Sequence, residues 1–336
     1  MAALALPIAR RAPRVAGIAG IARVASAACL GARYAPVHAH TLTVTPGGTL
    51  TFGWEFAPWV TALLCISLAL YVIGFARLER RGTHGRVARR AHAAAFGAGW
   101  LTLALVLVSP LATLSGALFS AHMVEHEAMM LIGAPLIILG RPLGIMLWAL
   151  PHPIRLALGR LVRTRTWTAC WRRIAAPIWA WSLHAVALWA WHAPELFEAA
   201  VAHPIIHTLQ HTSFLLTALL FWRGIVGEAA TRRGTGHAML SLFTTMVHTS
   251  ALGALIALAP GLWYPSYIEP TRMLGVDPLQ DQQLGGLIMW IPGGLAYLIG
   301  ALVVAARWLS EGPRISQQSR WPTPRADRPA FKEWPR

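Results

Sequence analysis

The chain has 336 residues, of which 56% are hydrophobic and 12% are charged, and its formal net charge is +16. Soluble globular proteins and disordered proteins do not combine so apolar a composition with so one-sided a charge. The 16 Trp and 23 Pro residues accompany long runs of Leu, Ala and Val, which is typical of a polytopic membrane protein. A basic total is also compatible with nucleic-acid binding, so the positions of the basic residues have to decide.

The first 39 residues have the pattern of a secretory signal peptide. Three Arg residues precede a moderately apolar segment, Val15–Gly31, which Arg23 interrupts. Small residues at the last and third-last positions before a cut predict cleavage between Ala39 and His40. Residues 40–58 would then form a short periplasmic segment.

Seven apolar stretches follow, each close to the roughly 17–25 residues that cross a bilayer as a helix. They are Trp59–Phe75, Ala93–Leu111, Phe119–Leu139, Pro177–Trp191, Pro204–Phe221, Met239–Leu258 and Leu284–Ala306. The fourth is the shortest, and Pro292-Gly293-Gly294 inside the seventh predicts a kink or a break of that helix. The sequence therefore predicts an all-α membrane protein with a seven-transmembrane helix bundle over residues 59–308. Residues 309–336, rich in Pro, Arg, Ser and Gln, are predicted to form a disordered basic cytoplasmic tail.

Basic residues alternate from loop to loop. The loops after the first, third and fifth spans and the carboxyl tail hold 23 of the 29 Lys and Arg residues, whereas the opposite loops hold one, Arg272. The positive-inside rule then places the amino end outside and the carboxyl end in the cytoplasm. Because this distribution orients a protein in a membrane, nucleic acid is not needed to explain the charge.

Histidines are spaced as metal ligands on a helix would be. The 14 His residues would form about 0.6 i,i+4 pairs at random, and the sequence has three such pairs on segments that read as helix. Residues four apart lie on one face, a turn apart, so each pair can present two imidazoles to one ion. The pairs are His122/His126, His203/His207 and His207/His211.

The predicted topology brings two pairs to one depth. The third and fifth spans both run inward from the outer face, so four histidines lie in the outer half of the bundle: His122, His126, His207 and His211. His192 and His203 lie at the outer mouth, and His248 lies near the middle of the sixth span. The competing interpretation, above all for His203 and His248, is a hydrogen bond between helices.

The third span adds sulfur and a carboxylate. Met123 and Met130 share a helix face with His126 by steps of three and four residues. Imidazole and thioether without thiolate favour copper, although zinc would also accept the histidines and a Met in an apolar span is commonly core packing. Glu125 is costly in hydrocarbon, so we expect it to face the bundle interior, as a partner of the ligands or a proton acceptor.

Several motifs occur in an order that resembles the CtaG-type cytochrome c oxidase assembly family. One is His122-Met-Val-Glu-His126 followed by Ala134-Pro-Leu-Ile-Ile-Leu-Gly-Arg-Pro142. Others are His203-Pro-Ile-Ile-His207-Thr-Leu-Gln-His211, Trp263-Tyr-Pro-Ser-Tyr267 and Asp281-Gln-Gln-Leu-Gly-Gly. The resemblance covers about Trp59 to Trp308, and it departs where the family often has Gln and this chain has Glu125.

The resemblance implies a multi-pass protein of the bacterial cytoplasmic (inner) membrane that matures a haem–copper oxidase and is not an enzyme. Its expected partners are cytochrome c oxidase subunits, above all the copper-containing catalytic subunit, and membrane lipid, with no nucleic acid. We expect copper on the periplasmic side, held by the four histidines, with His248 closing the site from below. His192, His203 and Asp281 would collect the cation at the mouth, and Glu125, Met123 and Met130 would support the ligands.

Three other functions compete. A copper transporter would need polar groups through to the cytoplasmic half, of which the sequence offers a partial set. A haem-binding membrane protein stays open for a single haem, although i,i+4 pairs about 6 Å apart along the helix axis suit one compact ion better. An intramembrane hydrolase is the weakest alternative, because the His pair departs from the His-Glu-x-x-His pattern of zinc proteases.

Overall fold

The computed structural model describes residues 43–44, 50–82, 85–228 and 232–318. Two short strands, β1 (Thr43–Val44) and β2 (Leu50–Thr51), pair antiparallel ahead of the first long helix. The expected signal peptide, its cleavage site and residues 319–336 of the expected tail lie outside the described residues, so they stay predictions.

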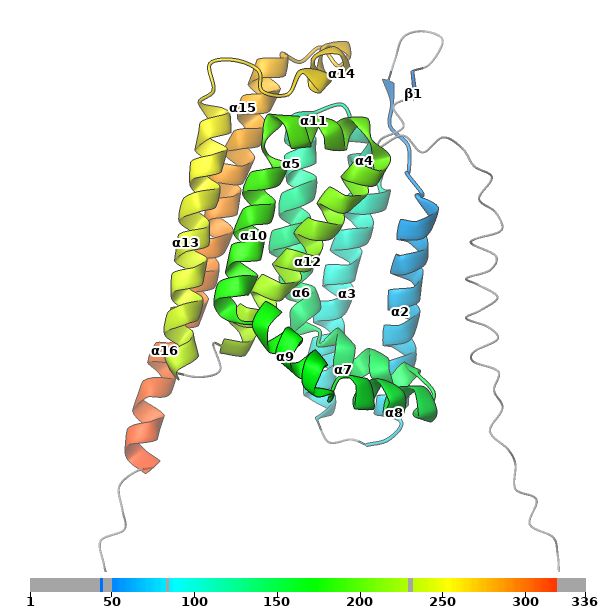
Figure 1. The fold of residues 1–336 in the computed structure, drawn as a ribbon, viewed down its shortest axis with the longest axis vertical. Helices are drawn as coiled ribbons and strands as arrows, with labels where there is room; N and C mark the ends of the chain where they lie inside the picture. Colours follow the sequence, from blue (N-terminus) through cyan, green and yellow to red (C-terminus); the bar gives the residue numbers. More distant parts are fainter. Residues whose placement is uncertain (1–42, 45–49, 83–84, 229–231, 319–336) are drawn as a thin grey trace, which may run out of the picture.

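Long apolar helices form the bundle (Figure 1). Five are continuous: α2 (Pro58–Glu79), α3 (Arg86–Val108), α10 (Pro177–Trp191), α12 (Pro204–Glu228) and α13 (Arg232–Ala257). Two are interrupted: α5 (Phe119–Glu127), η1 (Ala128–Gly133) and α6 (Ala134–Leu139) form one, and α15 (Pro278–Ile288), η4 (Met289–Gly293) and α16 (Gly294–Gln318) form the other. The last helix thus runs into the segment predicted as a disordered tail from residue 309.

Six of these helices are long and apolar enough to cross a membrane. The number is seven if α10, which has 15 residues, forms one span with α9 (Arg165–Ile174), to which it is bent by 59°. The predicted all-α multi-pass membrane fold is confirmed. The shortest predicted span, Pro177–Trp191, corresponds to α10, which is the short helix that meets α9 at a bend.

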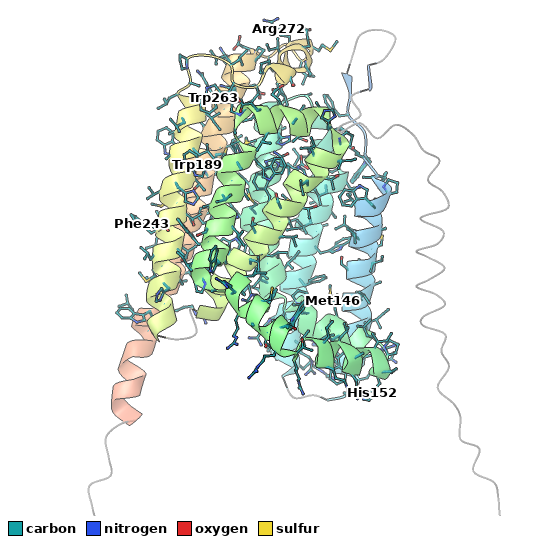
Figure 2. All side chains as sticks on the ribbon, viewed as in Figure 1. Met146, His152, Trp189, Phe243, Trp263 and Arg272 are labelled. Carbon is teal, nitrogen blue, oxygen red and sulfur yellow. The ribbon has the colours of Figure 1, made fainter. Side chains whose placement is uncertain are left out.

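Short helices lie at the two ends of the bundle. The end uppermost in Figure 1 has α4 (Pro110–Leu114), α11 (Pro194–Ala202), η3 (Pro265–Tyr267) and α14 (Ile268–Met273). The lower end has α7 (Pro142–Met146), η2 (Leu147–Ala149), α8 (His152–Leu161) and α9. Helices α8 and α9 carry five Arg residues, whereas α4, α11 and α14 carry one, Arg272, which lies at the upper end (Figure 2). The connections therefore alternate between the ends as the charge pattern predicts, and the orientation in a membrane stays a prediction.

Proline explains both interruptions. Pro292 lies inside the π-helical turn η4, and Pro135 follows the π-helical turn η1 by two residues. A proline within a helix lacks the N–H that would reach back one turn, and its ring clashes with the carbonyl four residues earlier, so a wider turn relieves the clash. The sequence predicts the break at Pro292 and not the one before Pro135. The η1 turn begins two residues after His126.

Small residues allow the last two spans to pack closely. A Cβ added to Gly286 would lie 2.4 Å from the backbone nitrogen of Ala257, and one added to Gly253 would lie 2.7 Å from that of Trp290. Such contacts between small residues bring backbones together where lipid cannot drive association. The neighbouring face of α15 packs on α5, because a Cβ at Gly285 would clash with the ring of Phe119. The seventh span thereby positions the start of the third.

Candidate metal centre

Four of the predicted ligands converge in the upper half of the bundle. The ring centroids of His122 and His126 are 4.3 Å apart, and those of His207 and His211 are 4.1 Å apart. Between the two helices, the rings of His126 and His211 are 4.9 Å apart and those of His122 and His207 are 5.8 Å apart. The i,i+4 spacing on α5 and α12 thus places four imidazoles around one point.

Three of these histidines meet the geometric requirement for a shared ion. One ring nitrogen from each of His122, His207 and His211 lies within 4.8 Å of the others. Metal–imidazole bonds of about 2.0–2.1 Å in a tetrahedral site hold nitrogens roughly 3.3 Å apart, so modest side-chain movement would close the site. Rings of Phe197 and Phe214 lie 5.1 Å from His122 and 4.7 Å from His126, so the cluster has an apolar wall.

His126 has the environment of a ligand more than of a packing residue. Its side chain is 1% exposed, and neither of its ring nitrogens has a hydrogen-bond partner among the described residues. A buried polar group without a partner is costly, and native proteins contain few of them. A metal ion would remove this cost, so the donor set fits a transition metal.

A fifth imidazole borders the cluster. His192, just after α10, is 2% exposed, and its ring centroid is 6.4 Å from that of His126. Its Nδ1 lies 2.7 Å from the carbonyl oxygen of Leu188, so this nitrogen is the donor and Nε2 keeps a lone pair. Nε2 is buried and has no hydrogen-bond partner among the described residues. His203, predicted to share the mouth with His192, is exposed and has no described ring contact with the cluster.

Glu125 lies inside the bundle beside the cluster. Its side chain is 1% exposed, and Oε1 is 3.7 Å from Nδ1 of His211. A carboxylate in this position can orient an imidazole, accept its proton or balance the charge of a bound cation. Glu125 therefore faces the bundle interior, as we expect for a carboxylate that is costly to expose to hydrocarbon.

Tyr267 joins the site from the short helix η3 at the upper end. Its hydroxyl donates to the carbonyl oxygen of Ser115 over 3.0 Å and lies 3.2 Å from Nδ1 of His122. Because the hydroxyl hydrogen points to Ser115, the phenol oxygen can accept from Nδ1–H, which would leave the lone pair of His122 on Nε2, where a metal ion could bind. Burial raises the pKa of Tyr267 well above its ordinary value, so the phenol stays protonated. Its motif was visible in the sequence, but nothing local linked it to a histidine 145 residues away.

His248 lies apart from the cluster. Its Nδ1 accepts a hydrogen bond from Nε1 of Trp189 over 3.4 Å, and its ring meets Trp181 edge-on with centroids 5.9 Å apart. Among the described contacts of His248, none is with the four clustered histidines. This position does not favour the predicted role of closing the site from below, because helix α13 turns the side chain toward α10.

The two methionines pack in apolar cores. Met123 is fully buried with Phe119 and Phe197, and Met130 belongs to the larger core around Phe214. This packing does not favour the prediction that the thioethers support the ligands. Met123 follows His122 by one residue, so its side chain points to a different side of the helix, toward α15.

Asp281 has a structural role. Its carboxylate accepts hydrogen bonds from the backbone nitrogen of Phe119 over 2.6 Å, from that of Ser120 over 3.3 Å and from the Ser120 hydroxyl. These are the unsatisfied donors of the first turn of α5, so Asp281 caps that helix from the seventh span. This position does not favour the predicted role as a cation collector, because the side chain is 3% exposed and its oxygens already accept hydrogen bonds.

A cavity opens beside the cluster within the bundle. It has a volume of about 490 Å³ and lies between α2, α3 and α12. Glu125, His207 and His211 line it on one side, and Trp59, Leu63 and other apolar side chains line the rest. The metal centre therefore borders a lateral cavity as well as the upper loops.

Residues 69–311 match the family described as "Cytochrome c oxidase caa3 assembly factor (Caa3_CtaG)". The chain belongs to this family. The matched region contains every residue of the histidine cluster, together with Glu125 and Tyr267. The CtaG-type resemblance is thus confirmed, and the family is described by a role in the assembly of cytochrome c oxidase.

Relatives among curated proteins are more distant. The chain is 25% identical over 278 residues to an uncharacterized protein of Mycobacterium leprae (strain TN), a match that covers 78% of this chain and 40% of the relative. Uncharacterized proteins of Mycobacterium bovis (strain ATCC BAA-935 / AF2122/97) and Mycobacterium tuberculosis (strain CDC 1551 / Oshkosh) are each 26% identical over 278 residues, covering 79% of this chain and 40% of theirs. The chain thus spans about two fifths of these relatives. No solved structure matches it significantly.

Proposed function

We propose that this oxidase assembly factor binds copper through His122, His126, His207 and His211 and aids its delivery to the copper-containing catalytic subunit of cytochrome c oxidase. The observation that carries the proposal is the convergence of two i,i+4 pairs. Three of the four histidines are buried, and His126 among them has no hydrogen-bond partner among the described residues. Membership of a family of cytochrome c oxidase assembly factors supports the oxidase as the partner.

The ligand set supports a first-row transition metal with imidazole preference. Because Met123 and Met130 pack in apolar cores, the donors near the cluster are the imidazoles and the carboxylate of Glu125. Among divalent ions such sites bind copper more tightly than zinc, iron or manganese. The proposed preference for copper therefore rests on the affinity of imidazole ligands for copper and on membership of the family, and not on the thioether ligands that the sequence suggested.

The lateral cavity supports transfer to a membrane partner. An ion bound by His207 and His211 borders a cavity between α2 and α12, so a partner helix could approach within the bilayer. We propose that the site faces the periplasm of a bacterial inner membrane, because the lower end of the bundle carries the basic loops.

Transport through the bundle and haem binding fit the structure less well. Below the cluster, Phe214, Phe221 and Trp222 belong to an apolar core. The buried His184 in this core already shares hydrogen bonds with Thr217 and Tyr297, so it is less suited to pass an ion on. Between the two helices, the rings of His126 and His211 are 4.9 Å apart and those of His122 and His207 are 5.8 Å apart, which leaves no room for a macrocycle between them.

The experiment is metal analysis of purified variants in detergent. Wild type is dialysed against copper and then against buffer, and bound copper per chain is compared with that of the double variant His126→Ala/His211→Ala. The matched control is His203→Ala, an exposed histidine of the same end outside the cluster. We expect about one copper per chain in wild type and control and loss in the double variant; equal copper in all three would overturn the proposal.

A second measurement separates delivery from scaffolding. In cells that lack the chain, an inserted catalytic subunit without copper supports delivery. Loss of the subunit itself would contradict delivery and favour a scaffold.

A further inference from the structure

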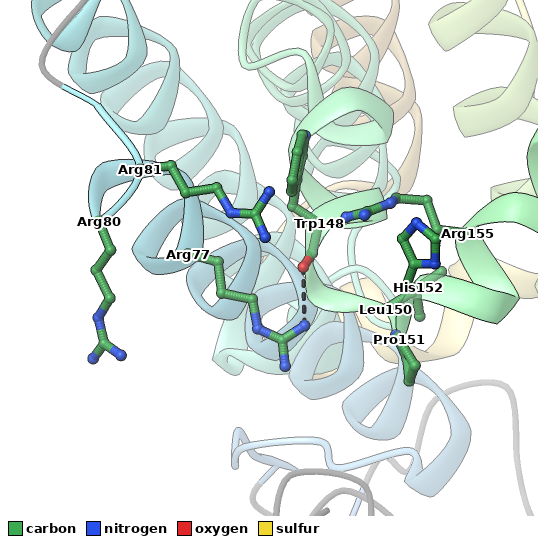
Figure 3. A pocket seen from close by; sticks show the side chains of 8 residues that line it. All are labelled: Arg77, Arg80, Arg81, Trp148, Leu150, Pro151, His152 and Arg155. Carbon is green, nitrogen blue, oxygen red and sulfur yellow. Dashed lines mark hydrogen bonds between the residues drawn. The ribbon is translucent and has the colours of Figure 1, made fainter. Parts of the chain in front are cut away.

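Trp148 lies between two guanidinium groups at the lower end of the bundle. The Cζ atom of Arg81 is 4.7 Å from the centroid of its ring, and that of Arg155 is 4.4 Å from it (Figure 3). Both distances are within cation–π range. From below, Nη1 of Arg77 donates to the carbonyl oxygens of Trp148 over 3.0 Å and Ala149 over 2.8 Å. Three cations are thus held around one residue by contacts that leave their charge uncompensated.

These cations line a pocket of about 390 Å³ between the foot of α2 and the start of α8. Its lining consists of Arg77, Arg80, Arg81, Trp148, Leu150, Pro151, His152 and Arg155, none of which is acidic. Arg80 points away from Trp148, whereas Arg81 and Arg155 flank it (Figure 3). Like charges gathered in this way repel one another unless an anion lies between them.

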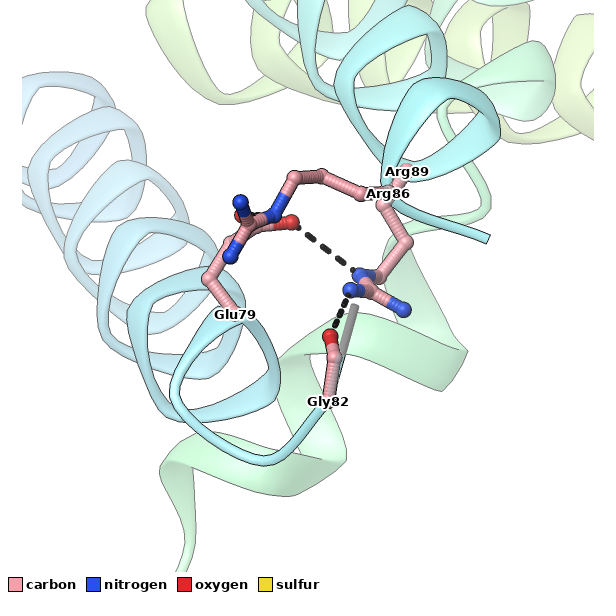
Figure 4. Close-up of polar contacts among 4 residues, drawn as sticks. All are labelled: Glu79, Gly82, Arg86 and Arg89. Atoms are coloured by element: carbon pink, nitrogen blue, oxygen red, sulfur yellow. Dashed lines mark hydrogen bonds and ion pairs between the residues drawn. The ribbon is translucent and has the colours of Figure 1, made fainter. Parts of the chain in front are cut away.

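The acid that is nearest along the chain does not serve this pocket. Glu79 forms ion pairs with Arg86 over 3.0 Å and Arg89 over 3.2 Å, and Arg89 also donates to the carbonyl of Gly82 (Figure 4). This network closes the turn between α2 and α3. Within the described part of the chain, Arg81 and Arg155 form no ion pair with an acid.

The pocket lies at the level where a spanning helix leaves the membrane. Helix α2 ends at Glu79, and α8 crosses the lower end with no buried residue (Figure 1). Ile154 and Leu156 of α8 are 46% and 47% exposed, so a helix with basic residues presents apolar side chains outward. Helices of this kind lie in the interface between headgroups and acyl chains, and Trp prefers the same level.

We propose that this pocket binds the phosphate group of an anionic phospholipid. Arg81 and Arg155 would contact the phosphate oxygens, since guanidinium groups match phosphate geometry. Trp148, Leu150 and Pro151 would contact the glycerol and the first acyl carbons, which a free phosphate lacks. The lipid would tie α2 to α8, two elements on opposite sides of the pocket. This site is independent of the histidine cluster and of the proposed copper function.

The test measures lipid binding to the purified full chain by native mass spectrometry. Phosphatidylglycerol and phosphatidylcholine are added separately to wild type, to the double variant Arg81→Gln/Arg155→Gln and to the control Arg163→Gln, an exposed Arg of the same end outside the pocket. Wild type and control are expected to prefer phosphatidylglycerol, and the double variant to bind it about 30-fold more weakly, from the loss of two charges at a membrane surface.

Two further arms keep the result interpretable. If the glutamine variant does not fold, Arg81→Lys/Arg155→Lys keeps both charges and is expected to retain the preference for phosphatidylglycerol. Inorganic phosphate at millimolar concentration should not displace the lipid. Equal binding by wild type and the glutamine variant, equal binding of both lipids, a loss of preference in the lysine variant, or displacement by free phosphate would each overturn the proposal.

Discussion

Replacing Asp281 by Asn tests whether this residue holds the third span in place or attracts metal ions. The carboxylate accepts two backbone N–H groups and one hydroxyl at the start of α5, the helix that carries His122 and His126. Asn keeps the shape of the side chain and one acceptor oxygen. Its NH₂ group, however, would face one of the donors at the start of α5, and the negative charge of the carboxylate is lost.

The magnitude follows from these contacts. A hydrogen bond to a charged group contributes about 1.5–3 kcal/mol, and an unsatisfied buried donor costs about 1–3 kcal/mol. We therefore expect the free energy of unfolding to fall by about 2 kcal/mol. This corresponds to a melting temperature lower by about 3 °C, because a chain of this length has an entropy of unfolding of about 0.7 kcal/mol/K. Copper bound per folded chain should be unchanged at 4 °C.

Asp277→Asn is the matched control. Asp277 is exposed and caps α15 through a single hydrogen bond of 2.9 Å from the backbone nitrogen of Gln280. Asn is as good an N-cap as Asp, so little change is expected. Both variants are melted in the same detergent. An unchanged melting temperature for Asp281→Asn together with slower copper uptake would refute the capping role and restore the cation collector.

Three more outcomes are expected. His126→Leu should raise the stability of the metal-free protein by about 1–3 kcal/mol by removing a buried polar ring, and should abolish the stabilisation by added copper; lower metal-free stability would contradict this. Gly286→Ala should cost at least about 2 kcal/mol because its Cβ meets the backbone of Ala257, whereas Gly224→Ala, with open space around its Cβ, should gain about 0.5–1 kcal/mol in the same thermal melts. Burial raises the pKa of Tyr264 above its ordinary 10.0, so the folded state binds the proton more tightly, and stability should fall as pH rises above about 10; Tyr264→Phe should show a shallower fall in urea titrations.

Local sequence rules account for the membrane fold and for the histidine pairs. Hydropathy marks the spans, since a backbone in lipid must satisfy its own hydrogen bonds as a helix. The i,i+4 spacing puts His122 with His126, and His207 with His211, on one face whatever surrounds the helix. Pro292 likewise predicts its own break, because the clash with the preceding turn is local.

Contacts between distant segments depend on how the helices are rotated and docked, which no local pattern encodes. Tyr267 reaches His122 from the short helix η3, 145 residues away. Asp281 was predicted from its charge to collect cations, but its position against α5 makes it a cap. His248 was predicted from its depth alone, and the rotation of α13 turns it to Trp189. The sequence by itself determined which residues are ligand candidates and at what depth they lie. The tertiary structure decided which of them meet, because side chains at one depth form a ligand site only if each helix is rotated about its axis so that they face one another.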